Sequence, residues 1–282
     1  MMAPHEYVNE AAMSTSFSAH LIVEGNSDYR LVTEALKGNS KVNVIVVGTS
    51  DYVVSTILEF ERLSATLKFK MLGLIDQDYR IPLRKLPTTP LLVLTELRDI
   101  ECMMWQSAAY DRVVKELSSP TKLSKRGDTT GSIKKQIVDI ARRIGEIRFC
   151  SQKHQWNLTF RHLDCSKFVD KKTFVFSEDS FVAHINGPQT GKRLSKSDLP
   201  SAHNTAVNEP HFSNDLLLCR GHDLMALLAL GMARVWGSGS LRSLSADLVE
   251  RMFRSSYVDM FRSTATFKKL DDWITQSVAL PV

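Results

Sequence analysis

The feature that most constrains the fold is an alternation of short apolar runs with helical patterns in the first hundred residues. Residues 19–23, 42–47, 71–75 and 91–94 are almost entirely apolar and have the length of strands. Between them, residues 26–36 and 50–67 carry apolar side chains at helical spacing. Strands that are apolar on both faces are typical of a parallel sheet covered by helices. The chain is therefore predicted to begin with an α/β domain.

The rest of the chain is predicted to be mainly helical. Five isoleucines recur every three or four residues and mark one face of a long helix: Ile133, Ile137, Ile140, Ile144 and Ile147. Residues 223–236, 245–253 and 267–278 predict three more helices, while 174–176 with 181–185 resemble a hairpin and 187–214 a long polar loop. We expect a catalytic core over residues 1–108 and a mainly helical region over residues 109–282.

Carboxylates follow the first and third apolar runs. Glu24 comes directly after the first run, and Asp76 and Asp78 come directly after the third. The carboxyl ends of parallel strands line the crevice where ligands bind. Clustered carboxylates repel one another unless a cation neutralises them, and Mg²⁺ or Mn²⁺ prefers such oxygen ligands. We predict that Asp76 and Asp78 hold this metal, with Glu24 as a further ligand or as a general acid or base. The alternative is that all three are ordinary turn residues.

A second pair of carboxylates, Asp99 and Glu101, follows the fourth apolar run. Two-metal nucleases use such a group to hold the attacking and leaving oxygens, so Glu101 is a further catalytic candidate. The alternative is a pair of acidic residues at a helix N-terminus, where the helix dipole favours them.

The segment Arg220-Gly-His222-Asp223 opens an apolar helix. A helix N-terminus beside a cation suits a phosphate, so His222 is a substrate-binding candidate that contacts phosphate or moves a proton. The alternative reading is a cap or a buried hydrogen-bond donor.

Positive charge is concentrated in the middle of the chain. Residues 122–172 contain 13 Lys/Arg and 5 Asp/Glu, whereas the whole chain has a net charge of +5. Four of these cations lie away from the isoleucine stripe: Lys134, Lys135, Arg142 and Arg143. Aromatic residues lie between the cations, a mixture typical of surfaces that bind nucleic acid. The alternatives are a solvated helix face and a docking surface for an acidic partner.

The remaining signals concern metals and location. Cys150, His154, His162 and Cys165 have the residue types of a zinc site, although their spacing is not that of a zinc knuckle. The longest apolar run, 224–233, is about half of a membrane span, and residues 1–18 lack the pattern of a secretion signal. We expect a cytoplasmic protein with reduced cysteines and no membrane partner.

Glu24-Gly25 after the first strand and Asp76-x-Asp78 after the third resemble the motifs of the TOPRIM fold, over about residues 17–105. Topoisomerases, DnaG-type primases and OLD-family nucleases share this fold. The resemblance implies a Rossmann-like, mostly parallel sheet, Mg²⁺ on the aspartates, and the glutamate as general acid or base in phosphodiester chemistry. The sequence differs from those of topoisomerases, because no strand-passage machinery and no catalytic-tyrosine domain can be recognised in it.

More narrowly, residues 23–28, 73–78 and 99–101 look like those of TOPRIM effectors encoded beside an ABC-type ATPase, as in PARIS-type anti-phage systems. That resemblance implies a toxin nuclease held inactive by the ATPase sensor subunit, which cleaves tRNA after release, and a homodimer when active is compatible with it. Two alternatives remain open: an OLD-like nuclease that cuts DNA, and a non-catalytic regulatory subunit. Intact Glu24, Asp76 and Asp78 argue against the last.

Overall fold

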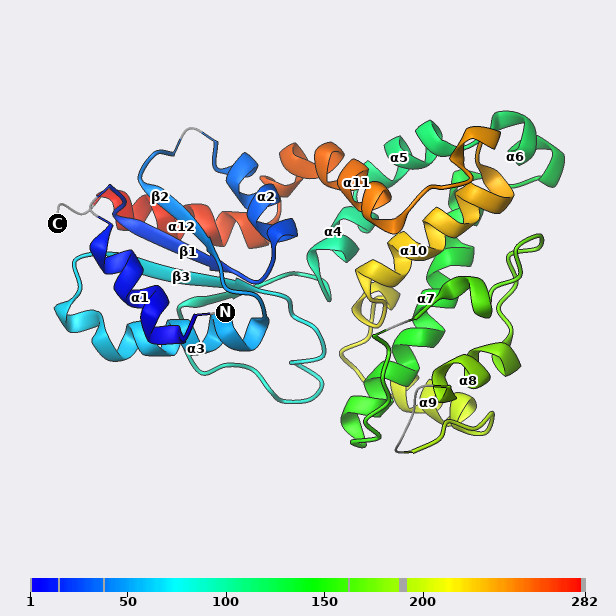
Figure 1. Ribbon diagram of the computed structural model, residues 1–282, viewed down its shortest axis with the longest axis horizontal. Coiled ribbons are helices and arrows are strands. Elements are labelled where there is room, and N and C mark those ends of the chain that lie inside the picture. The colour runs from blue at the N-terminus through cyan, green and yellow to red at the C-terminus, as the bar shows by residue number, and fades with distance from the viewer. Residues whose placement is uncertain (1, 15, 38, 162, 188–191, 280–282) are drawn as a thin grey trace. The chain divides into compact units, whose positions relative to one another are not determined.

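The computed structural model describes residues 2–14, 16–37, 39–161, 163–187 and 192–279, which divide into two compact units (Figure 1). The sheet unit comprises residues 1–77, 85–96 and 257–282, and the helical unit comprises residues 78–84 and 97–256. The expected boundary at residue 108 differs from this division in two ways. Residues 97–108 belong with the helical unit, and the C-terminal segment belongs with the sheet.

The sheet unit is built on four parallel strands. They are β1 (Ala19–Val23), β2 (Val42–Val46), β3 (Lys70–Ile75) and β4 (Leu92–Leu94), in the order β2-β1-β3-β4. In the central strand, Ile22 lies opposite Ile45 of β2 and Gly73 of β3. All five residues of β1 are buried, as expected for a strand with both faces covered. The predicted α/β fold with a parallel sheet is confirmed.

Helices cover both faces of this sheet. On one face, α1 (Pro4–Met13) and α3 (Ser50–Leu63) pack with Ile22 and Ile75 in a single apolar cluster. Leu21 and Val23 point to the opposite face, because successive side chains of a strand alternate. The helix α12 (Ala265–Ala279) packs on β1 and β4, and α2 (Asn26–Ala35) packs on β2 (Figure 1).

One glycine shows how tightly these layers approach. A Cβ at Gly73 would lie 2.5 Å from Leu92 Cδ2 and 2.8 Å from Val53 Cγ1. Both distances are shorter than real Cβ contacts, so β3 can carry no side chain at this position unless the side chains of Leu92 and Val53 move.

The helical unit is arranged around α7 (Thr130–Lys153), whose five stripe isoleucines are all buried. The other helices are α4 (Ile100–Gln106), α5 (Ala109–Leu117), α6 (Pro120–Arg126), α8 (Glu178–Asn186), α9 (Asp198–Val207), α10 (Gly221–Gly231) and α11 (Ala246–Phe261), which continues into the sheet unit. A π-helical turn, Met232–Trp236, extends α10. Short 3₁₀ turns occur at Ser64–Thr66, Cys165–Lys167, Asp215–Leu217 and Gly239–Leu241.

Two sequence predictions for this unit are wrong. Residues 181–185, predicted as half of a hairpin, lie in α8, because Ser177 caps that helix by accepting from Ser180 N and acidic residues occupy its first turn. Among the described residues between 165 and 187, the only strand-like contact is an antiparallel bridge between Val169 and Phe176. The predicted loop over 187–214 contains α9, while residues 188–191 lie outside the described residues.

The three predicted C-terminal helices are present as α10 with its π turn, α11 and α12. Within the described residues, no helix combines the length and the apolar character needed to cross a membrane.

Candidate metal centres

The carboxyl edge of the sheet brings two predicted residues together. The chain goes from β1 to β2 on one side of β1 and then to β3 on the other, so the strand order reverses between β1 and β3. Glu24 and Asp76 directly follow these two strands. Glu24 Oε1 accepts a hydrogen bond of 3.0 Å from the backbone N–H of Asp76, although 52 residues separate them. In open α/β sheets this reversal point is where ligands bind.

Local capping shapes the rest of this edge. Gly25 is the N-cap of α2, which begins at Asn26, and Gly25 N donates to Asp28 Oδ2 in the first turn at 2.9 Å. Beside Asp76, Gln77 N donates to Thr95 Oγ1 at 2.9 Å, which fixes the end of β4 next to the end of β3. The partly buried Glu24 and Asp76 therefore lie at a rigid edge, where carboxylate oxygens can hold a hard divalent cation.

Asp78 belongs to the helical unit, across the boundary from Asp76. It has a φ of 47°, its N–H donates to Arg98 O at 2.8 Å, and its Oδ1 lies 3.8 Å from Arg98 Nε. Loss of hydration raises the pKa of the Asp78 carboxyl above its usual value, and the Arg98 guanidinium opposes this shift. That Asp76 and Asp78 share a metal stays a prediction.

Asp99 has a structural role within the helical unit. Its Oδ1 accepts from Cys102 N, which caps α4, and its Oδ2 accepts from Gly221 N, both at 2.8 Å. Asp99 therefore ties the first turn of α4 to the first turn of α10. A Cβ at Gly221 would lie 2.1 Å from Glu101 Cβ, so glycine is required where these two turns meet. Asp99 is thus a carboxylate at a helix N-terminus, which is the alternative interpretation of this residue from the sequence.

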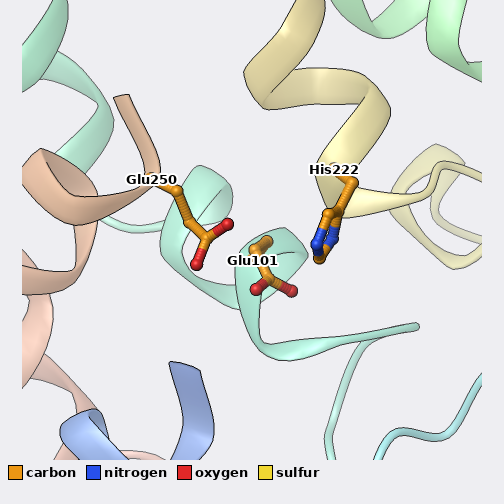
Figure 2. A group of neighbouring side chains, drawn as sticks. All are labelled: Glu101, His222 and Glu250. Carbon is orange, nitrogen blue, oxygen red and sulfur yellow. The ribbon is translucent and has the colours of Figure 1, made fainter. Parts of the chain in front are cut away.

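This close packing places Glu101 beside His222, and Glu250 of α11 completes the group (Figure 2). One ligand atom from each of the three side chains can be chosen so that all lie within 4.8 Å of one another. Glu101 is buried, the Glu250 side chain is 12% exposed, and His222 is exposed. Two carboxylates and an imidazole from three helices form a ligand set that fits a divalent transition metal. We call these three residues the Glu-His-Glu cluster.

Sequence reasoning found Glu101 and His222 separately but missed Glu250. In sequence, Glu250 is an ordinary charged position of an amphipathic helix, and it forms an i,i+4 ion pair with Arg254. Asp223, the residue after His222, has a structural role. Its two carboxylate oxygens accept from Arg148 at 3.0 and 3.2 Å in a buried ion pair.

The predicted basic face of α7 is largely occupied by local contacts. Arg142 pairs with Glu146, Arg143 pairs with Glu178 at 3.1 Å, and Lys134 Nζ lies 4.7 Å from the centre of the Tyr110 ring. Burial lowers the pKa of Lys134. Lys135 is exposed and forms no ion pair with any described residue. The free positive surface is thus smaller than the sequence predicts.

The cysteine and histidine group gains no support as a zinc site. Cys150 and Cys165 are buried, and burial raises the pKa of both thiols, which disfavours the thiolate that zinc needs. His162 lies outside the described residues. Among the residues that are described, the Glu-His-Glu cluster is the one set of three or more His, Cys, Asp or Glu side chains whose ligand atoms lie close enough together to hold one metal ion.

The sequence matches no protein-family model and no curated protein.

Proposed function

We propose that the chain is a metal-dependent phosphodiesterase of the TOPRIM type, an endonuclease that acts on nucleic acid. The observation that carries this proposal is the hydrogen bond from Asp76 N to Glu24 Oε1 at the point where the strand order reverses. It joins the two halves of the Glu-Gly and Asp-x-Asp pattern at the edge where open α/β sheets bind ligands. The all-parallel sheet of order β2-β1-β3-β4 is compatible with a TOPRIM domain.

The donor set at the sheet edge fits Mg²⁺, with Mn²⁺ as an alternative, because it consists of carboxylate oxygens. Asp76 would hold the cation, and we propose Asp78 as its second ligand. When bound, the metal supplies Lewis-acid stabilisation of the charge that develops on the phosphate. The Asp76 N–H holds Glu24 through Oε1 beside Asp76, where the glutamate would exchange a proton with the reacting oxygen.

The Glu-His-Glu cluster is proposed as a second metal site. Its imidazole favours Mn²⁺ or Zn²⁺ over Mg²⁺, because nitrogen ligands suit transition metals better than hard cations. The exposed position of His222 leaves the cluster accessible on one side, as a site that takes up an exchangeable ligand requires. His222 would in this case be a metal ligand rather than the phosphate contact expected from the sequence.

The biological setting is proposed from the motif resemblance. The chain would act as a toxin effector in anti-phage defence, restrained by a partner ABC-type ATPase and cleaving tRNA after release, as a homodimer when active. The concentration of positive charge between residues 122 and 172 supports a nucleic-acid substrate. The second candidate is cleavage of DNA by the same centre, since the sheet-edge carboxylates act on the phosphodiester and do not read the sugar.

The experiment is expression of the chain in bacteria, with and without its neighbouring ATPase and a trigger, followed by growth and by integrity of tRNA and chromosomal DNA. Wild type should arrest growth and fragment tRNA, and Glu24→Gln should do neither. Glu34→Gln is the matched control, because Glu34 lies on α2 of the same unit and is half-exposed in an i,i+3 pair with Lys37. Fragmented DNA with intact tRNA would favour the second candidate. Equal toxicity of Glu24→Gln and wild type would show that Glu24 is not part of the active site.

A further inference from the structure

An open pocket of about 360 Å³ lies in the helical unit among α7, the segment leading into α8, and α9. Its volume falls in the range of small-molecule sites. The apolar part of its lining includes Ile147, Phe176, Phe181 and Leu199, and the polar part comes from two arginines, two glutamates and His203. None of these residues belongs to the candidate metal centres.

The first functional element of the pocket is a carboxylate that orients a histidine. Glu146 is only 4% exposed, and its Oε1 contacts Arg142 Nη1 and also lies 2.9 Å from His203 Nδ1. The carboxylate favours the tautomer that carries the proton on Nδ1, which leaves Nε2 as the outward ring nitrogen. The His203 side chain is 47% exposed, and its hydrogen-bond contacts with Glu146 and Arg142 both involve Nδ1. Nε2 is therefore held in a fixed orientation and available to a ligand.

The second element is a partly exposed aromatic ring with a guanidinium over it. Phe176 packs against Phe168 and Phe181, with ring centres 5.7 and 5.3 Å apart, so its position is fixed by the core. The Arg143 guanidinium carbon lies 5.6 Å from the centre of the Phe176 ring. Arg143 Nη1 donates to Glu178 at 3.1 Å, and both side chains are about half-exposed. Most of the five N–H donors of Arg143 thus remain for a ligand.

The charge of the pocket indicates what kind of ligand it takes. Its two arginines are each paired with a glutamate, so the lining is balanced rather than basic. A phosphate would meet two carboxylates here as well as two guanidinium groups. A neutral, planar ring that both donates and accepts hydrogen bonds fits better, because it can stack on the Phe176 ring or on the guanidinium over it and bond His203 Nε2 at its edge.

We infer that this pocket binds a single unstacked nucleobase. The inference rests on the proposed function, since it gives the proposed nuclease a place for a base splayed out of a single-stranded segment. Recognition of single-stranded RNA generally relies on such bases, stacked on aromatic rings or guanidinium planes and hydrogen-bonded at their edges. Phe176 supplies the stacking surface, and His203, held by Glu146, supplies the edge contact.

The test is direct binding of adenosine, guanosine, cytidine and uridine to the purified full chain in the presence of EDTA, measured by saturation-transfer NMR and titration. At least one nucleoside should bind. Phe176→Ala should weaken that binding at least about fivefold, the lower end of the measured cost of losing a base–aromatic stack. His203→Ala should also weaken it. Ribose and inorganic phosphate are comparison probes and should not compete.

Two neighbouring variants serve as controls. Val175→Ala changes a side chain that is 61% exposed and adjacent to Phe176, and His211→Ala changes an exposed histidine outside the pocket. Both should bind as wild type, and thermal unfolding of every variant checks that it folds. The inference is overturned if no nucleoside binds, if Phe176→Ala and His203→Ala bind as wild type, or if inorganic phosphate displaces the nucleoside. Because the assay contains no metal and measures no cleavage, these outcomes leave the proposed nuclease activity to its own test.

Discussion

At the scale of single residues, the sheet contains a histidine that must stay neutral. His20 of β1 is fully buried between the rings of Phe17 and Phe69, with ring centres 6.3 and 5.1 Å away. Neither ring nitrogen has a hydrogen-bond partner among the described residues. Burial lowers the pKa of His20 to about 4. The imidazole is therefore packed as an aromatic core residue and has no part in either metal centre.

The lowered pKa of His20 sets the sign of a pH effect. The unfolded chain takes up a proton near the ordinary pKa of about 6.5, whereas the folded chain does so only near 4. Stability is therefore lost as the pH falls from about 6.5 to 4, by about 1–2 kcal/mol at pH 5. His20→Phe should remove this part of the pH dependence, measured by urea unfolding at pH 7.5 and pH 5. His211→Asn, at an exposed position, should leave it unchanged.

A second prediction at this scale concerns the contact between α4 and α10. Gly221→Ala places a Cβ 2.1 Å from Glu101 Cβ and 2.5 Å from Asp99 Oδ1, so the two turns must move apart. We expect a loss of about 1–3 kcal/mol in the free energy of unfolding. Gly239→Ala is the control, because a Cβ there meets no atom within 4 Å. Equal stability of the two variants in urea unfolding would show that the contact is not tight.

At the scale of secondary-structure elements, sequence patterns predicted the strands and α7 well because each depends on a local apolar period. The Asp76–Glu24 contact followed from the same reasoning, since parallel strand ends meet at one edge. Hydrophobic periodicity failed for α8, where the apolar positions Phe181 and Ile185 suit a strand or a helix and the Ser177 cap decides. Glu250 could not be found in this way, because only the packing of α11 brings it to α4 and α10.

The Glu-His-Glu cluster gives a prediction at the element scale, because each ligand comes from a different helix. Co²⁺ added to the purified chain should produce a visible absorption band from mixed nitrogen and oxygen ligands, and Zn²⁺ should remove it. His222→Ala and Glu250→Gln should weaken Co²⁺ binding at least about tenfold, since losing only a hydrogen-bond partner of a metal ligand already costs that much.

Asp247→Asn is the matched control for this titration. Asp247 lies three residues before Glu250 on the same helix, is exposed and pairs with Arg251. Its variant should bind Co²⁺ as wild type does. If His222→Ala and Glu250→Gln both bind Co²⁺ with the wild-type affinity, the cluster is not a metal site.

At the scale of the whole molecule, the two units are not two consecutive stretches of sequence. The chain leaves the sheet unit after Gln77, returns for residues 85–96, and returns again at Tyr257 to add α12. A domain boundary predicted from the change between strand and helix patterns cannot show that a later helix packs on the sheet. In sequence, α12 resembles the other C-terminal helices, but it packs against β1 and β4. The sequence predicts the net positive charge of residues 122–172. It does not predict the ion pairs of Arg142 with Glu146 and of Arg143 with Glu178, because these depend on the fold.

The proposed sheet-edge centre can be tested by hydrolysis of bis(p-nitrophenyl) phosphate by the purified chain. This substrate needs neither a base pocket nor a nucleic-acid surface. We predict hydrolysis with Mg²⁺ or Mn²⁺ that EDTA abolishes, and a loss of at least about a hundredfold in Glu24→Gln, the lower range for removing a general acid or base. Glu34→Gln should match wild type. Hydrolysis by Glu24→Gln at the wild-type rate would show that the sheet-edge carboxylates are not the active site.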